Sequence, residues 1–286
     1  MTSAVDTGCI EAEEDRMPVV VRGVPVHHVE AGAGRLLVCL HGWPSDHHHV
    51  QHDLEPLFEQ RDGWRRVYPD LPGMGRTPGA DTVRTQSDIV DIVAGFAEAL
   101  APGERYVVAG SSYGAYLGRW LTARHGDRID GFLAYVPAFR PDGGGARPEP
   151  TVLVPDAEVL AALEPGEELW ASANTVHTRR GLDWFREQLK PAIARADHAF
   201  LERIDAQGAP PVPVPMRPPF PGPTLLLAGR QDSWVGYADA YAALEDYPRA
   251  TYAVLDRAAH GLSVEQTALF RALVSEWLDR VEEYAG

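Results

Sequence analysis

Short apolar runs alternate with longer amphipathic stretches along most of the chain. Runs such as LLVCL and TLLLAG are apolar at almost every position, which is typical of strands buried on both faces of a parallel sheet. We predict eight such strands, at residues 19–23, 24–30, 36–40, 65–69, 105–110, 132–136, 224–229 and 251–255.

Helical patterns separate many of these runs, at residues 84–101, 113–125, 236–246 and 263–282. The last segment places Leu269, Leu273, Trp277 and Val281 on one stripe. A succession of strand, helix and strand predicts an α/β fold, with a mostly parallel, doubly wound sheet of about eight strands.

This alternation breaks between residues 139 and 222. The segment begins with RPDGGGARPEP, ends with the proline-rich PPVPVPMRPPFPGP, and contains helical patterns but no strong strand. We predict a helical insertion at 139–222 in a core formed by residues 18–138 and 223–286. Residues 1–17 are acidic and are expected to form a poorly ordered tail.

Composition narrows the class of protein. Hydrophobic residues make up 45% of the 286 residues, enough for a sizeable core, and the net charge is −15. Such acidity argues against nucleic acid and anionic membranes as partners. The chain shows neither a secretory signal nor an apolar run of the ~20 residues that span a membrane. We expect a soluble cytoplasmic protein, a monomer or homodimer, that binds a small-molecule substrate.

The stretch GSSYG, residues 110–114, lies between a predicted strand and a predicted helix. It fits the pattern G-x-S-x-G with Ser112 at its centre, because a serine at the apex of a strained turn needs small residues two positions away. The hydroxyl would lie at a helix N-terminus, where the amides favour developing negative charge. Ser112 is the predicted nucleophile.

A serine nucleophile requires a base and an acid that orients the base. Asp232 follows the strand TLLLAG and His260 follows the strand TYAVL, and both lie where a parallel sheet carries its catalytic loops. Their order along the chain is Ser, Asp, His, which is the order that accompanies a G-x-S-x-G turn of this kind. Asp142 is the alternative acid.

The stretch HGWPSDHHHVQHD, residues 41–53, directly follows the strand LLVCL. Its first turn can direct a backbone N–H at a reacting carbonyl oxygen, so we expect Trp43 and Tyr113 to supply the two oxyanion donors. His48 and His52, with Asp46 and Asp53 beside them, are spaced like metal ligands. No second ligand motif completes a set, and Asp46 fits better as a helix N-cap, so no metal site and no cofactor are predicted.

HGWP, DLPGMGRT, GSSYG, GRQD and AAHG follow one another in an order that resembles the α/β-hydrolase superfamily. The resemblance covers residues 19–138 and 223–284 and implies that the insertion 139–222 is a cap over the catalytic pocket. HGWP and DLPGMGRT look like epoxide hydrolases, but those use an aspartate where Ser112 stands and tyrosines in the cap, and 139–222 contains no Tyr. Prolyl iminopeptidases use a serine in the same place, and carboxylates in the cap. Glu167 and Glu168 are candidates for these carboxylates; alternatively, they belong to a solvated helix face.

The predicted function is hydrolysis of a small, largely hydrophobic ester, lactone or related acyl compound. The resemblance leaves open an amide hydrolase, a C–C bond hydrolase, a lyase, a cofactor-free oxygenase or a non-catalytic small-molecule receptor. The predicted substrate-binding residues, several of which could equally be cap core, are His41, Trp170, Trp184, Phe185, Phe220 and Trp234.

Overall fold

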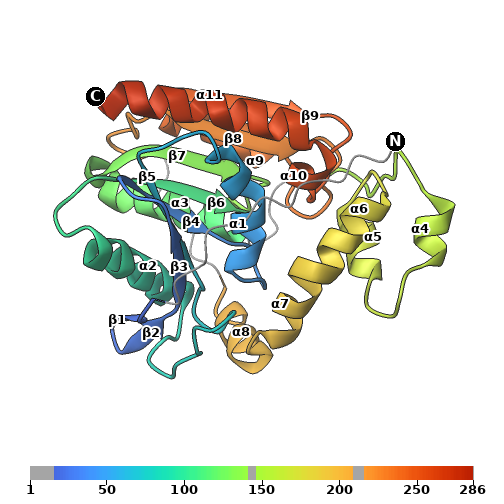
Figure 1. Cartoon of the computed structure of the whole chain (residues 1–286), viewed down its shortest axis with the longest axis horizontal. Coiled ribbons are helices and arrows are strands. Elements are labelled where there is room, and N and C mark those ends of the chain that lie inside the picture. The colour runs from blue at the N-terminus through green and yellow to red at the C-terminus, as the bar shows by residue number, and fades with distance from the viewer. Residues whose placement is uncertain (1–15, 141–145, 209–215, 286) are drawn as a thin grey trace.

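Seven strands form the main sheet in the part of the chain that the computed structural model describes, residues 16–140, 146–208 and 216–285 (Figure 1). Only the edge pair β3–β5 is antiparallel, so the predicted mostly parallel sheet is confirmed. Across the sheet the strands are β3 (His28–Ala31), β5 (Trp64–Pro69), β4 (Arg35–Leu40), β6 (Tyr106–Ser111), β7 (Ile129–Tyr135), β8 (Thr224–Gly229) and β9 (Ala250–Leu255).

The predicted strand at residues 19–23 does not join this sheet. Among the described residues the main sheet therefore has seven strands, where about eight were expected. β1 (Val19–Val21) and β2 (Val24–Val26) form a separate antiparallel hairpin. Its two turn residues, Arg22 and Gly23, have φ angles of 49° and 82°, the left-handed backbone that a tight two-residue hairpin requires. The predicted run 24–30 is interrupted at His27, whose amide donates to Thr77 Oγ1 at 2.9 Å.

Helices cover both faces of the sheet because side chains alternate along each strand. Leu36, Val38 and Leu40 pack towards one face, and Leu37 and Cys39 pack towards the other. The first face is covered by α2 (Gln86–Leu100), α3 (Tyr113–His125), α9 (Ala238–Ala242) and η4 (Ala243–Asp246). The second is covered by α1 (His47–Leu54), α10 (Leu262–Glu265) and α11 (Thr267–Ala285). Short 3-10 turns η1 (Glu55–Leu57) and η2 (Gly126–Arg128) follow α1 and α3.

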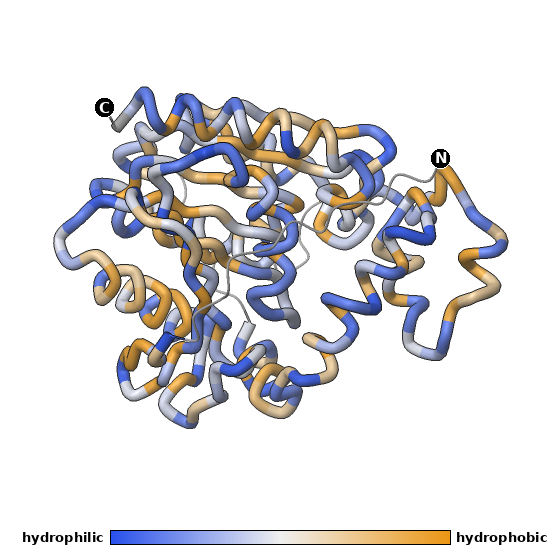
Figure 2. Tube along the Cα trace, viewed as in Figure 1, coloured by the Kyte–Doolittle hydropathy of each residue, from blue (hydrophilic) through white to orange (hydrophobic). Residues whose placement is uncertain are grey.

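Hydropathy along α11 explains its position on the sheet. Phe270, Val274, Trp277 and Val281 are buried at helical spacing. Figure 2 shows hydrophilic and hydrophobic residues alternating around this helix, so one side faces the sheet and the other faces solvent. Within the described residues, no helix is both long and apolar enough to cross a membrane.

The insertion divides into two parts that pack differently. Helices α4 (Ala157–Ala161), α5 (Glu168–Ala173), α6 (Arg179–Trp184) and α7 (Lys190–Arg195), with the π-helical turn η3 (Phe185–Leu189), extend to one side of the sheet (Figure 1). We call α4–α7 the cap. It has its own apolar cluster, built from Val159, Trp170, Leu182 and Phe185. In contrast, α8 (His198–Asp205) packs into the core on the α2 and α3 face.

Candidate active site

The turn from β6 into α3 holds Ser112 in a strained conformation. Its φ and ψ angles are 50° and −110°, which few residues other than glycine adopt. A Cβ on Gly110 would lie 2.4 Å from the carbonyl carbon of Gly114, and one on Gly114 would lie 2.1 Å from the carbonyl oxygen of Leu40. Both glycines are therefore required by close backbone approach, as the pentapeptide pattern predicts.

The structure brings Ser112, His260 and Asp232 together, although 148 residues separate the serine from the histidine. Ser112 Oγ lies 3.1 Å from His260 Nε2, and His260 Nδ1 lies 2.9 Å from Asp232 Oδ2. Asp232 is fully buried, and its Oδ1 accepts from the amides of Trp234 at 2.9 Å and Val235 at 3.0 Å. These two amides hold the carboxylate in the orientation that the imidazole needs. The alternative acid, Asp142, lies outside the described residues.

The two predicted oxyanion donors lie beside the serine. Tyr113 is the first residue of α3, and its ring meets that of Trp43 edge to face, with centroids 5.1 Å apart. Within the described residues, neither backbone amide donates to a backbone acceptor. A Cβ on Gly42, the residue before Trp43, would lie 3.5 Å from Ser112 Cβ. The turn at Gly42 and Trp43 therefore passes close to Ser112.

His41 lies beneath this turn rather than in an open pocket. Its side chain is fully buried, its Nδ1 lies 2.8 Å from the Gly42 carbonyl oxygen, and its Nε2 accepts from the Leu71 amide at 3.0 Å. The proton therefore stays on Nδ1, and burial lowers the pKa of His41. His41 acts as a neutral link between two loops, which argues against its predicted role in substrate binding.

The predicted aromatic substrate-binding residues occupy three different environments. Trp234 lies beside the triad, with its ring 5.0 Å from that of His260. Trp184 is half-buried and faces the rings of His49 and His52 at 5.8 and 5.6 Å. Trp170 and Phe185 belong to the cap's apolar cluster, where they are 2% and 3% exposed.

Phe220 packs in the core of the sheet domain and not in the cap. It is 2% exposed, its ring lies 6.0 Å from that of Tyr247, and its amide donates to the Asp246 carbonyl at 2.9 Å. The proline-rich context suggested a cap residue, but the partner that buries Phe220 is 27 positions further along the chain. The structure therefore places Phe220 away from the predicted pocket.

The histidine run serves several roles. As predicted, Asp46 caps α1, which begins at His47, and its carboxylate accepts from the amide of His48 at 3.2 Å. His47 Nδ1 and His27 Nδ1 each lie 2.8 Å from Asp70, close enough for the three residues to hold a metal ion. However, Arg76 Nη1 lies 3.2 Å from His27 Nε2, and a guanidinium can only donate. His27 therefore carries its proton on Nδ1 and donates it to Asp70, which makes this cluster a hydrogen-bonding hub.

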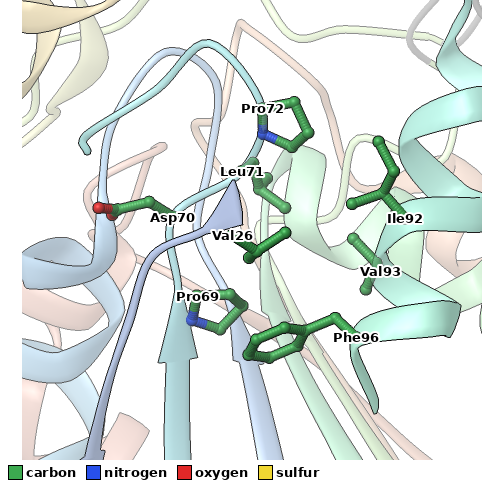
Figure 3. A pocket seen from close by; sticks show the side chains of 8 residues that line it. All are labelled: Val26, Pro69, Asp70, Leu71, Pro72, Ile92, Val93 and Phe96. Atoms are coloured by element: carbon green, nitrogen blue, oxygen red, sulfur yellow. The ribbon is translucent and has the colours of Figure 1, made fainter. Parts of the chain in front are cut away.

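This hub fixes the loop after β5. Asp70 is fully buried and also accepts from the backbone amides of His47 at 3.0 Å and Arg76 at 2.8 Å. Burial raises the pKa of Asp70, but the hydrogen bonds from His27 and His47 bring that pKa well below its usual range. In Figure 3 the Asp70 carboxylate points away from a cavity of about 10 Å³, room for about one water. The cavity has an apolar lining that includes Val26, Leu71, Ile92, Val93 and Phe96, and no triad residue lines it.

Glu167 is neither a solvated residue nor a free carboxylate for a substrate amine. It is fully buried, its two oxygens accept from Arg186 at 2.8 and 2.7 Å, and Lys190 adds a bond of 2.7 Å. The Arg186 guanidinium holds the pKa of Glu167 well below its usual range. Glu168 is exposed and accepts from the Gly166 amide at 2.8 Å, as expected of a solvated helix face.

Sequence reasoning gave no specific role to His49, which lies beside the serine. A Cβ on Gly42 would lie 3.7 Å from His49 Cε1 as well as 3.5 Å from Ser112 Cβ. Burial lowers the pKa of His49 to about 4, so its imidazole is neutral at pH 7. The signal available in the sequence was its position in the first turn of α1, shortly after the turn that holds Gly42 and Trp43.

Comparisons with known proteins bear on the family and the fold of this chain. A family model described as "Alpha/beta hydrolase family" matches residues 37–273. A pimeloyl-[acyl-carrier protein] methyl ester esterase of Aeromonas hydrophila is 26% identical over 267 residues, 89% of this chain and 97% of that protein. Epoxide hydrolase 3 of Siraitia grosvenorii is 27% identical over 129 residues, 44% of this chain but only 40% of that protein.

Solved structures show the same fold. An alpha/beta superfamily hydrolase from Oenococcus oeni PSU-1 superposes with a TM-score of 0.82 at 19% identity, covering 94% of this chain and 99% of the other. A thermophilic esterase from Thermogutta terrifontis superposes with a TM-score of 0.65 at 21% identity, covering 94% and 99%.

Proposed function

Because the chain belongs to the alpha/beta hydrolase family, we propose that it is a serine hydrolase that transfers an acyl group to water through Ser112. The observation that carries the proposal is the unbroken line of hydrogen-bond distances from Ser112 Oγ through His260 to Asp232. The substrate is a small, largely hydrophobic ester, lactone or related acyl compound. The full-length similarity to a methyl ester esterase supports the ester class.

The geometry suits a two-step mechanism. His260 Nε2, 3.1 Å from Ser112 Oγ, takes the hydroxyl proton as the oxygen attacks the substrate carbonyl. The amides of Trp43 and Tyr113 stabilise the oxyanion, and Asp232 stabilises the imidazolium. His260 then protonates the leaving alcohol. Water, deprotonated by the same imidazole, hydrolyses the acyl-enzyme and restores the serine.

Epoxide hydrolase and iminopeptidase activities find less support. The epoxide hydrolase chemistry described above needs a carboxylate nucleophile, and Ser112 stands at that position. An iminopeptidase needs a carboxylate available to a substrate amine, and Glu167 is fully paired with Arg186 and Lys190. A lyase, an oxygenase or a receptor would keep the triad without an acyl-enzyme, so burst kinetics distinguish them from a hydrolase.

The decisive experiment is a panel of p-nitrophenyl esters, methyl esters, lactones and aminoacyl anilides. On whichever substrate is hydrolysed, Ser112→Ala is expected to lower kcat at least about a thousandfold. Ser111→Ala, which changes the neighbouring buried serine, is the matched control and is expected to retain activity. Turnover by Ser112→Ala at the wild-type rate would refute the nucleophile assignment.

The acid is tested separately. Asp232→Asn is expected to lower kcat about 10⁴-fold, because the amide cannot hold the imidazole in the required tautomer. A comparable loss in Asp142→Asn, with Asp232→Asn active, would move the acid to Asp142. An initial burst of p-nitrophenol equal to the enzyme concentration is the expected sign of an acyl-enzyme.

A further inference from the structure

One carboxylate joins the loop of the candidate base to the cap. Glu265 ends α10, five residues after His260. Its Oε2 accepts from the amide of Ala259 at 2.6 Å, and its Oε1 accepts from the amides of Thr175 at 2.6 Å and Val176 at 2.8 Å. Ala259 directly precedes His260, whereas Thr175 and Val176 follow helix α5 of the cap.

Further backbone contacts surround this carboxylate. The amides of His260 and Gly261 both donate to the Ala173 carbonyl, at 3.0 and 3.3 Å. A Cβ on Gly261 would lie 2.0 Å from Asn174 Oδ1, so the two segments approach as closely as a glycine allows. Asn174 Nδ2 in turn donates to the Trp170 carbonyl at 2.7 Å, which anchors the segment to α5. Residues 173–176 and 259–261 therefore form one continuous contact.

From this contact we infer that Glu265 is a positioning residue, which sets the His260 loop against the cap so that the imidazole meets both Ser112 and Asp232. The inference rests on the proposed function. Hydrogen bonds to an ionised carboxylate are short and strong, so three of them hold the loop more firmly than neutral pairs would. Without the carboxylate, three amides lose their acceptor at a partly buried site.

The amide hydrogen bonds to Glu265 are what favour its ionised form. Burial raises the pKa of Glu265, and the amides of Ala259, Val176 and Thr175 oppose that shift. The nearby charge of Asp232 also raises it. Asp232 is bonded to the imidazole of His260, and Glu265 to the backbone of the residue before it.

The test compares Glu265→Gln with Glu276→Gln, a control on α11 whose carboxylate is 54% exposed and pairs with Arg280. The glutamine keeps one carbonyl oxygen for the two cap amides but presents an N–H donor where Ala259 needs an acceptor. Both variants are assayed on a p-nitrophenyl ester, and their active sites are counted with a fluorophosphonate. Counting sites separates enzyme that has lost its fold from enzyme whose base is misplaced.

For Glu265→Gln we expect an unchanged number of sites, a kcat per site at least about tenfold lower, and a KM within about twofold of wild type. The control should match wild type in all three. A kcat per site within about twofold of wild type would overturn the inference. Fewer sites with a normal kcat per site would also overturn it, because that result describes stability alone.

Hydrogen exchange in the wild type provides a second test, for the case in which Glu265→Gln fails to fold. The amides of Ala259, Thr175 and Val176 are expected to exchange slowly and together. Fast exchange at Thr175 and Val176, with α11 protected, would overturn the inference. Because this measurement needs no substrate, it tests the Glu265 contact even if Ser112→Ala disproves the proposed function.

Discussion

A Cβ on Gly114 would lie 2.1 Å from the carbonyl oxygen of Leu40, so α3 can begin beside Ser112 only if that position carries no side chain. The obstacle is the backbone of a central strand, which cannot yield in the way that a flexible side chain can. The start of α3 and the end of β4 therefore pack backbone against backbone beneath the candidate site.

Gly114→Ala tests this close packing of α3 against β4. The substitution is expected to lower the free energy of unfolding by about 1–3 kcal/mol through overpacking, and to lower kcat by moving Ser112. Gly126→Ala is the control, since Gly126 has a φ of −58° and its nearest neighbour to a new Cβ is 3.4 Å away. Urea unfolding and ester hydrolysis measure the two effects. Equal stabilities for the two variants would contradict the prediction.

Trp170 and Trp184 should separate stability from specificity in the cap. Trp170→Ala removes a side chain that is 2% exposed, so it is expected to destabilise the cap by about 3–5 kcal/mol. Trp184→Ala removes a half-buried ring facing His49, 5.8 Å away, and is expected to change kcat/KM across a series of acyl chain lengths with little loss of stability. Thermal unfolding measures the first effect and the chain-length series measures the second. The prediction is wrong if Trp184→Ala is the less stable variant, or if Trp170→Ala is the variant that changes the preference for chain length.

Asp46 predicts a pH window for stability. Burial raises the pKa of Asp46, but hydrogen bonds from His48 and Arg195 bring that pKa down to about 2, below its ordinary value of 3.8. Because the folded pKa is depressed, this stabilisation is complete above about pH 4 and is lost as the pH falls through about 2.

Asp46→Asn removes the charge but keeps a good N-cap residue. At pH 7 the variant should be less stable than wild type by on the order of 2 kcal/mol, and the difference should vanish near pH 2. Urea unfolding between pH 2 and 7 provides the measurement. A difference that does not change with pH would mean that the charge of Asp46 does not contribute.

Much of the fold could be predicted because its signals are local. Buried parallel strands are continuous apolar runs, and the fold class that they predicted is confirmed. The residues around Ser112 could be predicted because a strained turn admits only glycine at positions 110 and 114. The loops of Asp232 and His260 followed from the position of each residue after a strand, and the structure brings the three side chains within hydrogen-bonding distance.

The features that could not be predicted depend on partners far away in the chain. Glu167 and Glu265 are both acidic residues near helix ends, yet one pairs with Arg186 in the cap and the other with backbone amides 89 and 90 residues away. Phe220 resembles any aromatic residue in a proline-rich segment until Tyr247 packs against it. The pattern of apolar and polar residues around Glu167, Glu265 and Phe220 can indicate whether each is buried. It cannot indicate which distant residue each one contacts.

The contact between Glu265 and the cap uses main-chain N–H groups of Thr175 and Val176, not their side chains. Almost any amino acid except proline could supply the same donors at those two positions. Directed evolution of a new specificity could therefore randomise Val176, which is half-buried, while leaving the contact between Glu265 and the cap intact. Thr175 is fully buried and its hydroxyl donates to the Thr151 carbonyl at 2.7 Å, so a library should leave that position unchanged.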